Sequence, residues 1–318
     1  MTAERVLITG AHGFIGRHTA RRLASQGYTV AGLGHGTWKA DEWQSWGLSD
    51  WHEADVSSES LRQYAQPSSV IVHCAGSGSV AFSIENPLPD FHRTVTTTMS
   101  VLEYVRTESR NTRVVYPSSA GVYGIADALP IREDARRAPV SPYGVHKSVA
   151  EQLISCYGSQ FGISACIIRF FSVYGCGLRK QLLWDGCRKL ASGDNVFMGT
   201  GKEVRDWLHV DDAADLLSVA IEHASPLCPV ANGGTGEGVS VCELLTHIAS
   251  CLQLDGKAPL FSTDQRIGDP FAYVADTTEA RRWGWKPSIH WRDRVSEYVA
   301  WWRLEMGLAQ PGAMESVD

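Results

Sequence analysis

Short apolar runs alternate with segments of helical periodicity along the first half of the chain. The apolar runs are rich in β-branched residues and have the length of buried parallel strands; they lie at residues 5–9, 28–33, 52–56, 70–76 and 113–119. Helical spacing marks residues 17–26 and 94–108, whereas residues 37–51 resemble a loop rich in tryptophan. This alternation predicts an α/β fold, a Rossmann-type doubly wound parallel sheet whose ligands lie at the carboxyl ends of the strands.

A glycine-rich turn joins the first predicted strand to the first predicted helix. It places Gly10, Gly13 and Gly16 in the pattern Gly-x-x-Gly-x-x-Gly. Glycine permits a tight turn, lets the backbone approach a pyrophosphate and lets the helix pack close to the sheet. The turn therefore predicts a dinucleotide cofactor, with its phosphates at the start of the helix.

The end of the second predicted strand bears on the choice of cofactor. An acidic residue at this place binds the ribose diol of NAD, but the chain has Gly34, His35 and Gly36. No carboxylate is present there to repel a 2′-phosphate, and His35 or Arg17 is a candidate contact for one, so we expect NAD(P) with a slight preference for NADP. The alternative stays open that His35 is an ordinary loop residue and that backbone holds the ribose. Asp55, in the third apolar run, is placed to bind the adenine amino group.

A third motif begins at Ser141 and Pro142, which predict a helix start, and the helix continues to about residue 162. Tyr143 and Lys147 are four residues apart on this helix, so their side chains project from the same face. An ammonium beside a phenol favours the phenolate and lowers the pKa of the tyrosine, which suits proton exchange with a sugar hydroxyl or ketone. The same spacing occurs by chance on many helices, so a catalytic role for Tyr143 and Lys147 depends on the other motifs of the chain.

Composition and charge exclude several classes of function. The 318 residues carry a net charge of −6 with scattered lysine and arginine, which argues against nucleic-acid or membrane partners. The eight cysteines lack a CxxC pair or zinc-like spacing, no apolar run is long enough to span a bilayer, and the chain opens without a signal peptide. We expect a cytoplasmic protein with reduced thiols and no metal site.

Three motifs in this order resemble those of the extended short-chain dehydrogenase/reductases, and most closely the nucleotide-sugar epimerase/dehydratase family. They lie at residues 9–16, 118–124 and 143–147. The likeness extends from about Val6 to Trp302 and includes further motifs at residues 169–175, 205–213, 232–236 and 266–269.

The resemblance implies how the chain is divided and assembled. A Rossmann domain is expected at residues 1–170 with segments near 205–235. A smaller C-terminal lobe, mainly residues 171–204 and 236–318, is expected to bind a nucleotide-diphosphate sugar. The resemblance also implies a homodimer, formed through the helices that start near Thr94 and Tyr143.

The resemblance implies a role for each matching residue. Tyr143 is the general acid/base, Lys147 holds the nicotinamide ribose and tunes Tyr143, and Ser119 hydrogen-bonds the reacting sugar oxygen; Ser118 is the rival for the serine role. The residues implied in substrate binding are Ser83, Ser172, Arg205 and Arg266. Those expected at the cofactor are Gly10, Gly13, Phe14, Ile15, Gly16, His35, Asp55, Val56, Ala75 and Lys147. Two departures from the usual asparagine of the family are Ser172 and Thr94.

The residues after Ser119 narrow the reaction. Nucleotide-sugar 4,6-dehydratases carry an Asp-Glu pair there, whereas this chain has Ala120 and Gly121, which cannot transfer protons. The missing acid also disfavours a decarboxylase, so hydride transfer at C4 of an NDP-hexose remains. The serine motif favours an epimerase, and the missing acid after the second strand favours an NADPH-dependent 4-ketoreductase. Both stay open, as does a non-catalytic nucleotide-binding protein.

Overall fold

Seven parallel strands form the central sheet of the computed structural model, which describes residues 4–254, 258–263 and 270–308. Their order is β11-β6-β5-β4-β1-β2-β3, so the chain winds outward from β1 and β4 in both directions. The strands are β1 (Arg5–Thr9), β2 (Thr29–Gly34), β3 (Leu48–Glu53), β4 (Val70–His73), β5 (Arg113–Ser119), β6 (Ala165–Phe170) and β11 (Val230–Gly233). In β1, for example, Val6 lies opposite both Val30 and Val70. The predicted doubly wound sheet is confirmed.

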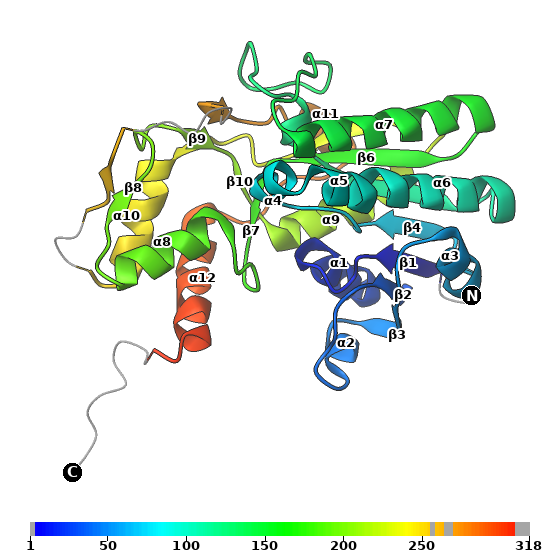
Figure 1. Cartoon of the computed structure of the whole chain (residues 1–318), viewed down its shortest axis with the longest axis horizontal. Helices are drawn as coiled ribbons and strands as arrows, with labels where there is room; N and C mark the ends of the chain where they lie inside the picture. Colours follow the sequence, from blue (N-terminus) through cyan, green and yellow to red (C-terminus); the bar gives the residue numbers. More distant parts are fainter. Residues whose placement is uncertain (1–3, 255–257, 264–269, 309–318) are drawn as a thin grey trace.

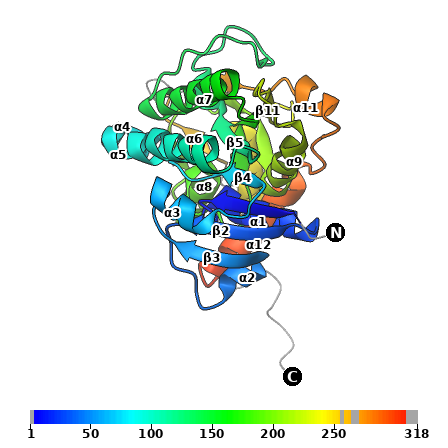
Figure 2. The same ribbon diagram turned by 90° about the vertical axis from the view of Figure 1, so that its right-hand side faces the viewer.

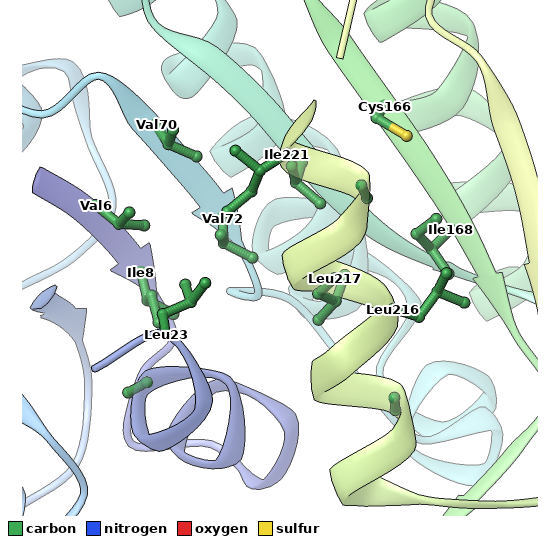
Figure 3. Close-up of a cluster of buried hydrophobic side chains, with 14 of the residues drawn as sticks. Val6, Ile8, Leu23, Val70, Val72, Cys166, Ile168, Leu216, Leu217 and Ile221 are labelled. Carbon is green, nitrogen blue, oxygen red and sulfur yellow. The ribbon is translucent and has the colours of Figure 1, made fainter. Parts of the chain in front are cut away.

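Helices cover both faces of the sheet (Figure 2). Successive strand residues point to opposite faces, so Val6 and Ile8 enter one apolar layer and Leu7 enters the other. The first layer includes Leu23 of α1 (Phe14–Ser25) and Leu216, Leu217 and Ile221 of α9 (Val210–His223), as Figure 3 shows. The second layer is covered by α3 (Ser58–Tyr64), α6 (Thr97–Glu108) and α7 (Pro142–Phe161).

A smaller part of the molecule lies beyond the carboxyl ends of the strands (Figure 1). Its apolar core is built on α8 (Gln181–Ala191), α10 (Val241–Cys251) and α12 (Trp291–Glu305). Its short strands are β7 (Ser172–Tyr174), β8 (Val196–Phe197), β9 (Val204–Arg205), β10 (Trp207–His209), β12 (Val239–Ser240), β13 (Leu260–Phe261) and β14 (Ala272–Tyr273). The chain returns to the large sheet for α9 and β11, and α11 (Thr278–Arg282) packs beside β11. Lys180 joins the two parts, because its Nζ donates to the carbonyl of Gly78 at 3.1 Å.

Two segments differ from the expectation. Residues 37–51, expected as a loop, contain α2 (Glu42–Ser45) and most of β3, which begins at Leu48 rather than at residue 52. As an edge strand, β3 buries only Leu48 and therefore lacks a continuous apolar run. The helix expected from residue 94 is preceded by elements that the periodicity did not predict: α4 (Val80–Glu85), α5 (Pro87–Phe91) and the π-helical turn η1 (His92–Thr96).

All eight cysteines are free thiols. Within the described ranges, no helix has both the length and the apolar character needed to cross a bilayer. Over the same ranges, no group of histidine, cysteine and acidic side chains is arranged to hold a metal ion.

Candidate active site

The N-terminal turn of α7 carries the first candidate residues. Ser141 caps this helix, since its hydroxyl accepts a hydrogen bond from Gly144 N at 3.2 Å, and Pro142 is the first helical residue. The predicted helix start is therefore confirmed. Tyr143 and Lys147 lie one turn apart on this helix, as their spacing predicted.

Gly144 lets α7 approach the short 3₁₀ turn η2 (Ala120–Val122) closely. A Cβ atom at Gly144 would lie 2.4 Å from the carbonyl oxygen of Gly121, which is too close for any side chain. A Cβ atom at Gly121 would lie 3.4 Å from Ser119 Oγ and 3.6 Å from two ring carbons of Tyr143. The close approach therefore places the Tyr143 ring and the Ser119 hydroxyl beside each other, around Gly121.

Ser118 and Ser119 have different surroundings. Ser118 is only 4% exposed, and its hydroxyl donates to Glu151 Oε1 at 2.5 Å. The same carboxylate accepts from Arg169 Nη2 at 2.8 Å, so Ser118 belongs to a buried ionic cluster. The geometry favours Ser119, which faces Tyr143, for contact with a substrate.

Lys147 donates to the backbone of β5. Its side chain is 6% exposed, Nζ donates to the carbonyl of Pro117 at 2.9 Å, and Nζ lies 4.6 Å from the centre of the Tyr116 ring. Burial lowers the pKa of Lys147 to about 8. Burial also raises the pKa of Tyr143, and the neighbouring Ser119 hydroxyl offsets only part of that effect. The spacing predicted a lowered pKa for Tyr143; in this structure the pKa is raised, because burial has the largest effect. The Lys147 ammonium donates to the Pro117 carbonyl instead of to the phenol.

Ser83 lies behind the candidate tyrosine. Its hydroxyl accepts a hydrogen bond from Tyr143 N at 3.0 Å and donates to Val80 O at 2.7 Å. The side chain is fully buried at 0% exposure. Ser83 therefore contacts the backbone of the acid/base candidate, and a direct contact with the sugar stays a prediction.

The glycine-rich turn fits a dinucleotide pyrophosphate. Gly10 has a φ of +71°, and a Cβ atom there would lie 2.7 Å from Ala75 N, so only glycine allows this approach to the end of β4. A Cβ atom at Gly16 would lie 2.4 Å from Gly10 O. Helix α1 begins at Phe14, after Gly13, with no capping side chain and no acidic residue in its first turn. Its first N–H groups are thus suited to bind phosphate.

Other expected cofactor residues contribute to packing. Ile15 packs against the apolar layer between α1 and the sheet, and Phe14 packs against the core of the smaller part. Val56 is 9% exposed and lies in the layer on the other face of the sheet. The side chains of these three residues therefore pack within the protein, and their contact with a cofactor stays a prediction.

His35 and Asp55 are paired at the edge where β2 and β3 end. His35 Nε2 lies 2.5 Å from Asp55 Oδ1, and both side chains are exposed. A carboxylate therefore lies near the end of β2 although β2 itself ends in Gly34. The other candidate for a 2′-phosphate, Arg17, donates through Nε to the carbonyl of His12 at 3.1 Å. Both side chains are thus engaged within the protein.

Two of the expected substrate residues, Ser172 and Arg205, lie on short strands of the smaller part. Ser172 begins β7, and its backbone N donates to the carbonyl of Asp206 at 3.0 Å. Arg205 ends β9, and its Nη1 donates to the carbonyl of Val204 at 2.9 Å. Arg266 lies outside the described residues. The structure thus places Ser172 and Arg205 on short strands of two different small sheets, and their contact with a substrate stays a prediction.

A family model described as "NAD dependent epimerase/dehydratase family" matches residues 6–229. The chain belongs to this family. It is 30% identical to a UDP-glucose 4-epimerase of Lactobacillus helveticus, over 93% of this chain and 95% of that protein. Among solved structures, MoeE5 in complex with UDP-glucuronic acid and NAD is 29% identical with a TM-score of 0.83, covering 95% of this chain and 99% of that one. UDP-glucose 4-epimerase from Brucella ovis in complex with NAD is 28% identical with a TM-score of 0.80, covering 92% and 96%.

The sequence prediction assigned no role to three residues that lie near the start of α7 in this member of the epimerase/dehydratase family. Gly144 follows the candidate tyrosine, and its role appears only when η2 is placed beside α7. Asp90 and His146 are paired, with Asp90 Oδ2 2.5 Å from His146 Nδ1. A carboxylate within an otherwise apolar helical stretch was the available signal for Asp90, but its partner lies 56 residues away.

Proposed function

We propose that this chain is a nucleotide-sugar 4-epimerase that acts on an NDP-hexose. The observation that carries the proposal is the position of Ser119 and Tyr143 beside each other at the carboxyl end of β5, since a Cβ atom on Gly121 would lie 3.4 Å from Ser119 Oγ and 3.6 Å from two ring carbons of Tyr143. Lys147 is buried one turn further along α7. A phenol and a hydroxyl that converge on one oxygen can move its proton and stabilise the charge that develops there. The relatives are named as 4-epimerases of UDP sugars, which supports the same reaction here.

In this proposal, each of the three residues has one task. Tyr143 takes the proton of the 4-hydroxyl and later returns it, and Ser119 donates a hydrogen bond to the same oxygen. Lys147 holds the nicotinamide ribose through its ammonium group. When bound, NAD supplies a positively charged nicotinamide that takes up a hydride from the sugar and gives it back. Ala120 and Gly121 provide no proton donor, so elimination of water as in a 4,6-dehydratase is not part of the proposal.

NAD is the cofactor that the structure supports better. The preference for NADP rested on Gly34 and on free cationic side chains beside it. Asp55 restores a carboxylate at this edge, and its partner His35 is engaged with it. The solved relatives MoeE5 and the Brucella ovis epimerase are complexes with NAD. The preference for NADP, and with it a 4-ketoreductase, stays the second candidate because β2 ends in glycine.

We further propose a division and an assembly for the chain. The smaller part binds the nucleotide diphosphate, with Arg205 and Arg266 on the phosphates and Ser172 near the sugar, since guanidinium groups suit phosphate. Met99 on α6 and Val145 on α7 are 38% and 42% exposed, and such apolar groups on adjacent helices suit a homodimer. Light scattering that showed a monomer at micromolar concentration would end the dimer proposal.

Two measurements test the function. Native mass spectrometry of the purified protein should show retained NAD, whereas an empty site that accepts NADPH would favour the reductase. Tyr143→Phe should lower kcat for UDP-glucose and UDP-galactose interconversion by ~10²–10⁴ while the fold and NAD binding survive. A kcat within a few-fold of the parent would remove Tyr143 from the mechanism. Absence of turnover by the parent with a panel of nucleotide sugars would support a non-catalytic protein instead.

A further inference from the structure

The loops that follow β1 and β4 leave the sheet from two neighbouring strands. Thr9 lies opposite His73, so the two strands run side by side to their carboxyl ends. From β1 the strand order continues to β2 and β3 in one direction, and from β4 it continues to β5 and β6 in the other. Such a reversal of strand order opens a crevice in which ligands bind. The glycine-rich turn and the loop at residues 74–79 therefore lie on the two sides of the expected cofactor site.

One segment of the smaller part reaches both sides of this crevice. It is the connection between β7 and α8 at residues 175–180, called the strap below. On the β1 side, a Cβ atom at Gly177 would lie 4.0 Å from Cδ2 of Phe14, the first residue of α1. The carbonyl oxygen of Cys176 lies 3.3 Å from Nε2 of His18, one turn further along α1. The strap thus lies against the helix whose start is expected to bind the cofactor phosphates.

On the β4 side, the strap ends in an ammonium group. Lys180 Nζ donates to the carbonyl of Gly78 at 3.1 Å. The same loop lies beside the candidate catalytic lysine, because a Cβ atom at Gly76 would lie 3.9 Å from Lys147 Nζ. Lys180 and Gly78 are both exposed, so water can replace their hydrogen bond and let the strap open. This bond therefore joins the two sides of the crevice through the strap.

The smaller part fixes the shape of the strap. Leu178 is 4% exposed and belongs to the apolar core of the smaller part. Its carbonyl accepts a hydrogen bond at 2.6 Å from the hydroxyl of Tyr298, which is 0% exposed. Loss of the bond at Lys180 should therefore free the strap from the loop at residues 74–79 without unfolding it.

We propose that Lys180 is a positioning residue that holds the strap closed over the cofactor and so retains NAD between catalytic cycles. The proposal rests on the epimerase function proposed above. An epimerase returns the hydride to the sugar in each cycle, so NAD is regenerated in place and does not have to leave. No proton or hydride passes through Lys180. Because its bond joins two protein segments, its loss should ease the entry of NAD as much as the departure.

Two variants at Lys180 separate the bond from the rest of the side chain. Lys180→Met removes the ammonium and keeps most of the aliphatic chain, whereas Lys180→Arg keeps a donor for the Gly78 carbonyl. The net contribution of one exposed hydrogen bond corresponds to about threefold to tenfold in a rate constant. Lys180→Met should therefore raise the association and dissociation rate constants of NAD by that factor and leave the dissociation constant unchanged. Lys180→Arg should restore rates close to those of the parent.

Both rate constants are measured by stopped-flow fluorescence. For dissociation, protein loaded with NAD is mixed with an excess of the fluorescent etheno analogue of NAD, whose uptake follows release of NAD. For association, NAD is added to protein freed of cofactor, and quenching of tryptophan fluorescence is followed. Lys189→Met is the matched control, because Lys189 Nζ donates to the carbonyl of Val196 at 2.6 Å on the same helix but within the smaller part. It should leave both rate constants as in the parent.

A larger dissociation constant with an unchanged association rate constant in Lys180→Met would mean that Lys180 binds NAD directly, and would overturn the inference. Changes in rate no larger than those in Lys189→Met would overturn it as well. The two proposals also fail separately. Faster exchange of NAD in Lys180→Met, in a protein that epimerises no nucleotide sugar, would contradict the epimerase function alone. An active epimerase with the same exchange rates in all variants would contradict the role of the strap alone.

Discussion

The backbone N–H of Tyr143 donates to Ser83 Oγ at 3.0 Å, and this bond joins α7 to α4. The first N–H groups of a helix have no partner within it, so Tyr143 N needs an acceptor from another element. Ser83 Oγ provides that acceptor, and its own hydroxyl donates a hydrogen bond to Val80 O. The position of the phenol therefore depends on a serine that precedes it by 60 residues.

Ser83→Ala removes the acceptor and leaves a buried N–H unsatisfied. We expect the free energy of unfolding to fall by about 1–3 kcal/mol, and kcat to fall while KM changes little, because Tyr143 loses its fixed place. Urea unfolding and initial rates measure the two effects. Ser57→Ala is the control: Ser57 caps α3 by accepting from Ser60 N at 3.2 Å, far from Tyr143 in the fold. A parent-like kcat for Ser83→Ala would contradict the positioning role.

Gly144→Ala tests the close approach of α7 to η2. The added Cβ would meet Gly121 O at 2.4 Å and Pro139 Cβ at 2.9 Å, so the helix must move away. Overpacking of this kind costs about 1–3 kcal/mol of stability, and separation of Tyr143 from Ser119 should reduce kcat by at least tenfold.

Gly158→Ala is the matched control on the same helix. Its Cβ would meet Cys228 Sγ at 2.4 Å, which is a clash of the same kind at the other end of α7. It should lower stability as Gly144→Ala does, measured by thermal unfolding, but leave kcat near that of the parent. Equal losses of kcat in both variants would show that strain anywhere in α7, rather than the approach to η2, limits turnover.

Arg169→Met tests the buried ionic cluster beside the site. Arg169 Nη2 donates to Glu151 Oε2 at 2.8 Å, and the two side chains are 4% and 1% exposed. Removal of Arg169 leaves the buried Glu151 charge paired only with the half-exposed Arg137, whose Nη1 lies 3.3 Å from Glu151 Oε2, so we expect a loss of at most about 3–5 kcal/mol in urea unfolding. Arg169→Lys keeps the charge but loses the forked contact and should lose less. A smaller loss of unfolding free energy in Arg169→Met than in Arg169→Lys would contradict this role of the ionic cluster.

The local signals of the sequence were sufficient for much of this architecture. Runs of β-branched residues located β1, β4 and β5, because these central strands are apolar on both faces. Ser141 and Gly162 marked both ends of α7, since a serine cap and a left-handed glycine are local chemistry. The edge strand β3 was displaced because only one of its residues is buried.

Local sequence patterns could not predict the contacts around Tyr143, because these contacts join residues far apart in the chain. Ser83 and Asp90 meet α7 only after the sheet is assembled, and no spacing in the chain relates them to Tyr143 or His146. The direction of the Tyr143 pKa also depends on burial and on where Lys147 points, and an i to i+4 spacing specifies neither. No acidic residue directly follows β2, but the carboxylate of Asp55, just beyond the end of β3, lies beside His35.

Asp55→Asn tests whether that carboxylate selects the cofactor. The parent should bind NAD more tightly than NADP, because a 2′-phosphate at the end of β2 would approach the negative charge of Asp55. The amide keeps an acceptor oxygen for the adenine amino group and removes the charge. Two like unit charges about 4 Å apart in water repel each other by about 1 kcal/mol. Removal of the Asp55 charge should therefore raise the affinity for NADP about fivefold to tenfold and change the affinity for NAD little.

The measurement is the dissociation constant of each cofactor for parent and variant in one buffer, since exposed charges are screened by salt. Asp50→Asn makes the same change in net charge within β3, the strand that Asp55 follows. Asp50 pairs with Arg5 at 3.1 Å, and the variant should leave the ratio of the two dissociation constants unchanged. The mutation Gly34→Asp is a poorer test, because Gly34 has a φ of +153° and a Cβ atom there would lie 3.2 Å from Gly10 N. A parent that binds NADP more tightly than NAD would refute the role of Asp55 and make the 4-ketoreductase the better proposal.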